Sequence, residues 1–240
     1  MTSSEIELVD LRSLSDAAKR RALCNAFYDE VYRAAFPKPD QSESPEIWLP
    51  LMEAPPAPPE PLLRVIVARW PDGGMAGGVV VEYFRASRAA LITYIVTAPQ
   101  ARRQGLARRL LDAAVAYASV DNGGSAPYVF GEVERPEAQQ TQEGRQIAET
   151  RLAAISGLGG RRLEFNYIQP SLGPGKQPAT DLMLVMFSQD DGRGSLPAAD
   201  LRAFIDEFFV SLQQKGGEEH QQVIQSLQGD RVAIAAIGAS

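Results

Sequence analysis

The chain of 240 residues alternates between short apolar runs and longer stretches in which apolar residues recur every three or four positions. The short runs are rich in β-branched and aromatic residues and predict strands, because such side chains favour an extended backbone. The longer stretches are typical of amphipathic helices. We expect strands at residues 5–9, 63–68, 76–84, 89–97, 128–133, 161–167 and 181–187, and helices at 17–35, 45–52, 102–118, 140–156 and 197–213. This order predicts a mixed α/β fold.

Proline and glycine mark the breaks between these elements. The prolines of residues 54–61 fix φ and remove amide donors, so this connector should be extended and stiff. Gly73 and Gly74 are expected to turn the first pair of long strands. We interpret residues 1–190 as one domain and residues 191–240 as a C-terminal helical extension, whose apolar tail could pack on the domain or on a partner.

Residues 94–111 carry the clearest chemical signal in the chain. A predicted strand stops at Pro99, a basic turn follows, and a helix begins near Leu106. Small residues at Gly105 and Ala107 leave the first backbone N–H groups of this helix uncovered. Unpaired amides and the helix dipole favour an anion, so we expect a pyrophosphate at this turn. The alternative interpretation is an ordinary basic helix start with a glycine in its turn.

The charge of the chain limits the classes of partner. A net charge of -6 and a pI near 5.0 argue against general nucleic-acid binding, which needs a basic surface. Four arginines nevertheless gather around the proposed phosphate turn and favour a local positive mouth for a ligand, although part of this group could be a solvated helix face. They are Arg102, Arg103, Arg108 and Arg109.

The numbers of cysteines and histidines and the hydropathy of the chain exclude further classes of site and of protein. Cys24 and His220 are each the single residue of their type, which excludes an internal disulfide, a zinc cluster and a Ser/His/Asp or Cys/His catalytic set. We expect Cys24 to be buried, His220 to lie at the surface, and no metal to be bound. Neither a secretory signal pattern nor an apolar run of about 18 residues occurs, so we expect a cytoplasmic protein without a membrane partner.

The hexad at residues 102–107 resembles the acyl-coenzyme A signature of the GNAT N-acyltransferase superfamily. Arg102, Gly105 and Ala107 fill its three defined positions. The resemblance implies a mixed, mostly antiparallel sheet flanked by helices and splayed between its fourth and fifth strands. It also implies acetyl-CoA as the acyl donor.

The same resemblance assigns the donor contacts to backbone atoms. The pantetheine arm would pair with the fourth strand at Ile95, Val96 and Thr97, like an added strand. The pyrophosphate would meet the amides of Arg103, Gln104, Gly105, Leu106 and Ala107. The expected chemistry is direct transfer, in which a neutral amine attacks the thioester, a base removes a proton, and an acid protonates the thiolate.

The acid of the family is absent from its usual position. Many GNAT proteins carry a tyrosine on the helix before a glycine that starts the next strand, and aligning Gly159 with that glycine places Ile155 at the tyrosine position. Tyr167 is the nearest aromatic hydroxyl downstream, and we predict it as the acid or as an acceptor contact. The alternative is a strand tyrosine that only packs against the sheet.

Two glutamates are the candidates for the base. Glu132 and Glu134 lie two positions apart at the end of the predicted fifth strand, so both carboxylates should share one face. A partly buried carboxylate there could accept the proton of the amine. An exposed pair would be only a charged strand face. Weaker candidates for acceptor contacts are Glu82, Tyr94, Asn166 and Gln169.

These observations predict a cytoplasmic N-acetyltransferase that moves an acyl group from acetyl-CoA to a primary amine of a small molecule or a peptide. Two alternatives remain. A non-catalytic acyl-CoA-binding or regulatory protein would bind CoA without turnover, and an interaction protein would do neither. The sequence leaves open the acceptor, the acyl length and the oligomeric state, for which a homodimer is one option.

Overall fold

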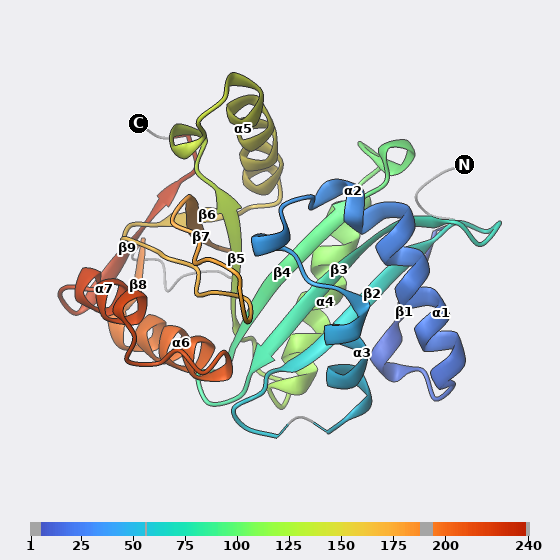
Figure 1. Ribbon diagram of the computed structural model, residues 1–240, viewed down its shortest axis with the longest axis horizontal. Helices are drawn as coiled ribbons and strands as arrows, with labels where there is room; N and C mark the ends of the chain where they lie inside the picture. The colour runs from blue at the N-terminus through green and yellow to red at the C-terminus, as the bar shows by residue number, and fades with distance from the viewer. Residues whose placement is uncertain (1–5, 56, 188–193, 239–240) are drawn as a thin grey trace. The chain divides into compact units, whose positions relative to one another are not determined.

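The computed structural model describes residues 6–55, 57–187 and 194–238 of the chain (Figure 1). It divides into two compact units. Unit 1 comprises Met1–Arg85 and Ala90–Pro127, and unit 2 comprises Ala86–Ala89 and Tyr128–Ser240. The predicted domain boundary after residue 190 lies outside the described residues, and the assignment of residues 1–190 and 191–240 stays a prediction.

The strands of unit 1 follow one another in space as they do along the chain. Their order is β1 (Glu7–Asp10), β2 (Leu62–Arg69), β3 (Met75–Phe84) and β4 (Ala89–Thr97). β2 pairs antiparallel with both β1 and β3. Gly73 has a φ of 97° in the turn between β2 and β3, a conformation that favours glycine. The predicted strands of this unit and their glycine turn are confirmed.

The helices of unit 1 also begin and end near the predicted residues. Asp16 caps the first of them, because its carboxylate accepts a hydrogen bond from the Lys19 amide. The predicted helix at 17–35 is continued by one π-helical turn before its last residues. The helices are α1 (Ala17–Phe27), the π-turn Tyr28–Tyr32, α2 (Arg33–Ala35), α3 (Pro45–Glu53) and α4 (Leu106–Asp121).

Helices cover both faces of this sheet, and successive side chains of β2 therefore contact different helices. Leu63, Val65 and Val67 belong to the core that holds Phe27 of α1 and Trp48 of α3. Arg64 points to the other face, where it binds Asp121 at the end of α4. The cysteine prediction is confirmed, because Cys24 is fully buried in this core.

The sheet of unit 2 contains two strands that the sequence did not predict. Its order is β5 (Tyr128–Glu134), β7 (Leu182–Met186), β6 (Arg161–Leu163), β9 (Arg231–Ala236) and β8 (Ser195–Pro197). All four neighbouring pairs are antiparallel. β6 is shorter than the predicted strand at 161–167. The apolar tail forms β9, which pairs with β6 and β8 inside the unit.

Helices also cover both faces of the strands of unit 2. Val133 of β5 packs with Leu152 of α5 (Gln142–Gly157). Phe130, on the opposite face of the strand, lies 4.7 Å from Phe204 of α6 (Ala198–Ser211), between ring centroids. α7 (Glu218–Ser226) packs on α6 and was not predicted. The predicted mixed α/β class, with a mostly antiparallel sheet flanked by helices, is confirmed.

The surface prediction for His220 is wrong. The residue is only 8% exposed and its ring lies 5.0 Å from that of Phe209. Its Nδ1 accepts a hydrogen bond from the Gly216 amide at 3.2 Å, so Nε2 carries the proton and donates to Asp206 at 2.8 Å. The polar stretch around it is one amphipathic helix, α7, and His220 lies on the inner side of that helix.

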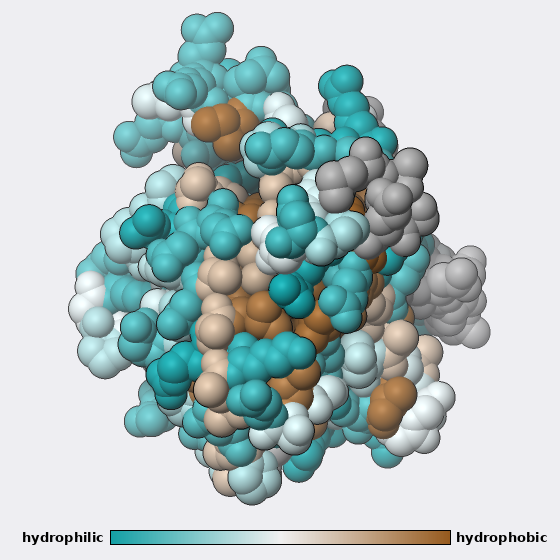
Figure 2. Space-filling view, turned by 90° about the vertical axis from the view of Figure 1, so that its right-hand side faces the viewer, coloured by the Kyte–Doolittle hydropathy of each residue, from teal (hydrophilic) through white to brown (hydrophobic). Residues whose placement is uncertain are grey.

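Large apolar side chains are seldom exposed in the described chain. The exposed ones are Ile47, Val120 and Ile147, which come from three different helices. On the face shown in Figure 2, polar residues surround a smaller apolar area. Scattered exposure of this kind is normal for a folded domain and does not by itself indicate a docking site.

Candidate functional site

The predicted phosphate turn joins β4 to α4 in unit 1. A single 3-10 turn, Pro99–Ala101, follows the strand. Arg103 and Gly105 then adopt left-handed conformations, with φ of 60° and 77°. Gly105 is the N-cap of α4, and no side chain caps this end of the helix. The first amides of α4 therefore depend on solvent or on a bound anion for their hydrogen bonds.

Gly105 is required by conformation rather than by packing. A Cβ atom added there would have no other atom within 4 Å, but its φ lies in the region that L-residues rarely adopt. Arg102 and Arg103 are exposed beside it. The other two arginines of the predicted cluster have partners, since Arg108 lies 3.9 Å from Asp112 and Arg109 donates to the Ile6 carbonyl at 2.9 Å.

The end of β4 is held close to β3. A Cβ atom at Gly77 of β3 would lie 2.5 Å from the carbonyl oxygen of Val96, so only glycine allows this approach. Beyond the strand, the Ala98 amide donates to the Ala76 carbonyl at 2.8 Å. Ile95, Val96 and Thr97 are half-buried. Their role as backbone partners of the pantetheine arm stays a prediction.

The predicted acid and one predicted base meet in unit 2. The Tyr167 hydroxyl donates a short hydrogen bond to Glu132 Oε1. Gln169 Nε2 donates to Glu132 Oε2 at 2.9 Å. The two donors therefore reach different oxygens of one carboxylate. Glu132 is half-buried, whereas Tyr167 and Gln169 are 1% and 5% exposed. We call these three residues the Glu132 cluster.

Burial controls the protonation of the tyrosine in this cluster. Desolvation raises the pKa of Tyr167 well above its ordinary value, and the charge of Glu132 and its hydrogen bond raise it further. The phenol therefore keeps its proton at neutral pH. A protonated hydroxyl can donate to a carboxylate or deliver a proton, so this arrangement is chemically compatible with an acid.

The loop that carries Tyr167 and Gln169 is anchored by main-chain contacts. Gln169 and Ala179 exchange two backbone hydrogen bonds of 3.0 Å. Arg135, which directly follows β5, donates to the carbonyls of Tyr167 at 3.3 Å, Thr180 at 2.8 Å and Leu182 at 2.9 Å. Sequence reasoning missed this role of Arg135, because binding to main-chain carbonyls imposes no side-chain pattern on the loop.

Glu134 lies in a different environment from Glu132. It is 8% exposed, and Arg151 Nη1 of α5 lies 2.6 Å from its Oε2. A buried carboxylate paired in this way supports the packing of α5 on β5. This contact favours a structural role for Glu134, and its role as a base stays a prediction.

The position that resembles the family's tyrosine site belongs to the core of unit 2. Ile155 packs in a cluster with Val133, Met183 and Val185. A Cβ atom at Gly160 would lie 2.6 Å from Ile155 Cγ2, so the glycine is needed where the chain leaves α5. Ile155 is thus explained by packing and supplies no acid.

The weaker acceptor candidates are dispersed. In unit 1, the Tyr94 hydroxyl donates to the Gln41 carbonyl at 3.3 Å, and Thr93 donates to Glu82 at 3.3 Å. In unit 2, the Asn166 carbonyl accepts a hydrogen bond from Ser226. Only Gln169 joins the Glu132 cluster.

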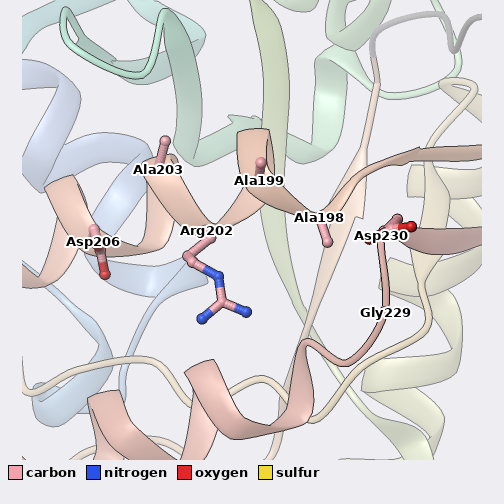
Figure 3. A pocket seen from close by; sticks show the side chains of 7 residues that line it. All are labelled: Ala198, Ala199, Arg202, Ala203, Asp206, Gly229 and Asp230. Atoms are coloured by element: carbon pink, nitrogen blue, oxygen red, sulfur yellow. The ribbon is translucent and has the colours of Figure 1, made fainter.

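A surface pocket of about 440 Å³ lies on α6 in unit 2 (Figure 3). Arg202 extends into it and donates to the Leu227 carbonyl at 3.0 Å. Its lining residues are Ala198, Ala199, Arg202, Ala203, Asp206, Gly229 and Asp230. None of the residues predicted from the sequence lines it.

Two further searches cover only the described residues. Within them, no three side chains of histidine, cysteine, aspartate or glutamate gather closely enough to hold a metal ion. None of the helices in the same part of the chain has the length and hydropathy needed to cross a bilayer.

Among three known structures with similarity to this chain, the first supports the fold. A protein from Bacteroides thetaiotaomicron assigned to the GNAT acetyltransferases shares 15% identity and a TM-score of 0.52, over 78% of this chain and 88% of that chain. Nourseothricin acetyltransferase has 24% identity over 52% of this chain and 64% of its own, with a TM-score of 0.33. The ribosomal-protein-S18-alanine N-acetyltransferase of Escherichia coli has 14% identity over 78% of this chain and 97% of its own, with a TM-score of 0.46.

No curated protein matches the chain in sequence. The family model "Acetyltransferase (GNAT) family" matches residues 25–138, which include β4, the turn at Gly105 and α4. Over these residues, slightly less than half of the chain, the sequence is therefore similar to the GNAT acetyltransferase family.

Proposed function

We propose that this protein is an N-acetyltransferase that moves the acetyl group of acetyl-CoA to a primary amine. The observation that carries the proposal is the turn at Gly105, where a left-handed glycine opens α4 without a side-chain cap beside two exposed arginines. Backbone amides at a helix start favour a phosphate group. The turn lies within the segment that matches the GNAT family model.

The proposed reaction is direct transfer. The nitrogen of a neutral amine attacks the thioester carbonyl carbon, a new C–N bond forms, and the C–S bond breaks. Glu132 is the proposed base for the proton that leaves the nitrogen. The thiolate of CoA must gain a proton, and Tyr167 is the proposed source because its hydroxyl is protonated at neutral pH.

The acceptor is proposed only as a class, an amine on a small molecule or a peptide. The net charge of -6 favours cationic acceptors in general and selects none of them. A cytoplasmic location and a homodimer stay predictions from the sequence.

One observation favours a second candidate function, a non-catalytic acyl-CoA-binding protein. Ile155 fills a core position where the resemblance leads us to expect a catalytic tyrosine. Such a protein would bind acetyl-CoA and release no thiol in the presence of amines. Turnover separates the two candidates.

The first experiment measures the binding of acetyl-CoA and CoA by calorimetry in wild type and in Gly105→Glu. The new carboxylate would face the expected phosphates, and like charges in contact cost several kcal/mol, so we expect affinity to fall at least ~100-fold. Gly123→Glu is the matched control. Gly123 is exposed, has a φ of 68° and has open space around its Cβ position, at the other end of α4.

The control carries the same backbone strain and the same charge, so it should bind both ligands as wild type does. Equal affinity in folded Gly105→Glu and wild type would reject the donor site. Where binding is found, release of the CoA thiol with a panel of alkylamines and lysine-containing peptides tests transfer. Binding without release by any amine would favour the non-catalytic alternative.

A further inference from the structure

The side-chain amide of Gln169 faces the Glu132 carboxylate with its nitrogen. A carboxylate accepts hydrogen bonds, so the amide must present its nitrogen, and Nε2 lies 2.9 Å from Glu132 Oε2. The reversed amide would bring two acceptors together. Gln169 is 5% exposed, which leaves it little freedom to turn toward water.

Two donors on different oxygens fix the orientation of the carboxylate. The terminal torsion of a glutamate side chain is broad when nothing restrains it. Here the Tyr167 hydroxyl holds Oε1 while Gln169 holds Oε2. Residues 167 and 169 lie two positions apart in the loop between β6 and β7, and both side chains reach the same carboxylate.

The segment is itself restrained, so the donors are in place before any ligand binds. The backbone of Gln169 exchanges two hydrogen bonds with Ala179. Arg135 holds the carbonyl of Tyr167 together with those of Thr180 and Leu182. Groups that are oriented in advance need little reorganisation during a reaction.

We propose that Gln169 is a positioning residue that orients the Glu132 carboxylate and favours its charged form for proton transfer. The inference rests on the proposed function, in which Glu132 is the base. Gln169 itself need not touch the amine or the thioester. The distinctive consequence is a change in the titration of Glu132 when the amide is removed, because a donor to a carboxylate favours the ionised state.

Charged groups on the neighbouring elements have partners of their own. On β5, Glu134 pairs with Arg151 of α5. After β5, Arg135 binds main-chain carbonyls, and before β7, Asp181 accepts from Gln139 at 3.4 Å. Within the cluster, Tyr167 is the other titratable group, and burial raises its pKa away from the range in which carboxylates titrate. These groups are the same in wild type and in a Gln169 variant, so a comparison isolates the amide.

The experiment uses the full chain with glutamate labelled by ¹³C at the carboxyl carbon. The signal of Glu132 is identified by its loss in Glu132→Gln and followed as a function of pH. In Gln169→Leu we expect its titration midpoint to rise by about one pH unit, since one hydrogen bond to a charged group is lost. Tyr167→Phe should shift the midpoint in the same direction.

Gln139→Leu is the matched control. Gln139 is a half-buried glutamine of unit 2 that also donates to a carboxylate, but that carboxylate belongs to Asp181. We expect the Glu132 midpoint to be unchanged in this variant. Gln169→Met is measured as well, because it keeps the length of the side chain and guards against misfolding of the leucine variant.

The second readout is the pH profile of acetyl transfer to the fastest amine of the panel. In Gln169→Leu the acid limb of the kcat profile should move to higher pH together with the Glu132 midpoint. KM for acetyl-CoA should stay within about twofold of the wild-type value. An unchanged midpoint in folded Gln169→Leu and Gln169→Met would overturn the inference. A shifted midpoint with an unmoved acid limb would also overturn it. Wild type without transfer to any amine would instead reject the proposed function, whatever the midpoint shows.

Discussion

Glu132 and Glu134 lie two positions apart on β5 and have different surroundings. Glu132 accepts hydrogen bonds from two neutral donors, whereas Glu134 lies 2.6 Å from the guanidinium of Arg151. The charged carboxylate of Glu134 already forms an ion pair with Arg151. Because these contacts differ, the two residues form a matched pair for testing the base.

Glu132→Gln should lower kcat by about 10²–10⁴-fold, the usual contribution of a general base, with little change in CoA affinity. Glu134→Gln should leave kcat within a few-fold of wild type. It should instead lower the free energy of unfolding by about 1–3 kcal/mol, because the ion pair between Glu134 and Arg151 is lost. Steady-state kinetics and chemical denaturation of both variants check these expectations. The reverse pattern, with kcat lost only in Glu134→Gln, would transfer the role of the base to Glu134.

The sequence predicted these candidate residues but not their partners. The alternation of a strand predicted that both glutamates share one face. One partner of Glu132 is Tyr167, which lies 35 residues further along the chain in a loop without regular periodicity. No local pattern predicts such a contact. The same limit applies to Gln169, which the sequence offered only as one of several polar residues.

At the scale of elements, the loop between β6 and β7 is held by the end of α6. Gln214 follows this helix, and its Oε1 accepts from the Ser171 amide at 3.1 Å while its Nε2 donates to the Ser171 carbonyl at 2.6 Å. A glutamine side chain that hydrogen-bonds both the amide and the carbonyl of one residue makes the contacts that a neighbouring strand would otherwise make. Ser171 lies two residues after Gln169, so this clamp restrains the loop that carries the Glu132 cluster.

Gln214→Leu should leave both main-chain groups of Ser171 without these partners and lower the free energy of unfolding by about 1–3 kcal/mol. Local opening should be larger, so peptides that cover residues 164–180 should exchange amide hydrogen faster. Gln222→Leu is the control, since Gln222 is exposed and donates only to Glu218 on the same helix. Unchanged exchange in Gln214→Leu would show that the loop is held by its other contacts.

Long periodic elements were predictable, and short or pairing-dependent ones were not. α4 and α6 each have a continuous apolar face, and β3 and β4 are long β-branched runs. β8 has three residues, and its partner β9 is an Ala-rich run that periodicity does not distinguish from a buried helix. Antiparallel pairing with β6 decides the conformation of β9. The tertiary context therefore supplied what local propensity lacked.

At the scale of the molecule, the C-terminal segment is an integral part of unit 2. β9 pairs with strands on both sides, and α6 contributes buried aromatic residues on the face of β5 that holds Phe130. The large apolar side chains of α6 that are buried are Leu201, Phe204, Ile205, Phe208 and Phe209. A segment that only docked on the surface would not need so many fully buried side chains.

Phe204 tests this interpretation most directly. Its ring is fully buried and lies 4.7 Å from Phe130 and 6.0 Å from Phe208, so Phe204→Ala removes contacts both to β5 and within α6. We expect a loss of about 3–5 kcal/mol and a Tm lower by about 10 °C, measured by calorimetry. Ile147→Ala is the control, because Ile147 is 46% exposed on α5 of the same unit and should change little. If α6 were a peripheral arm, Phe204→Ala would release that helix without lowering the main transition, and the two variants would melt alike.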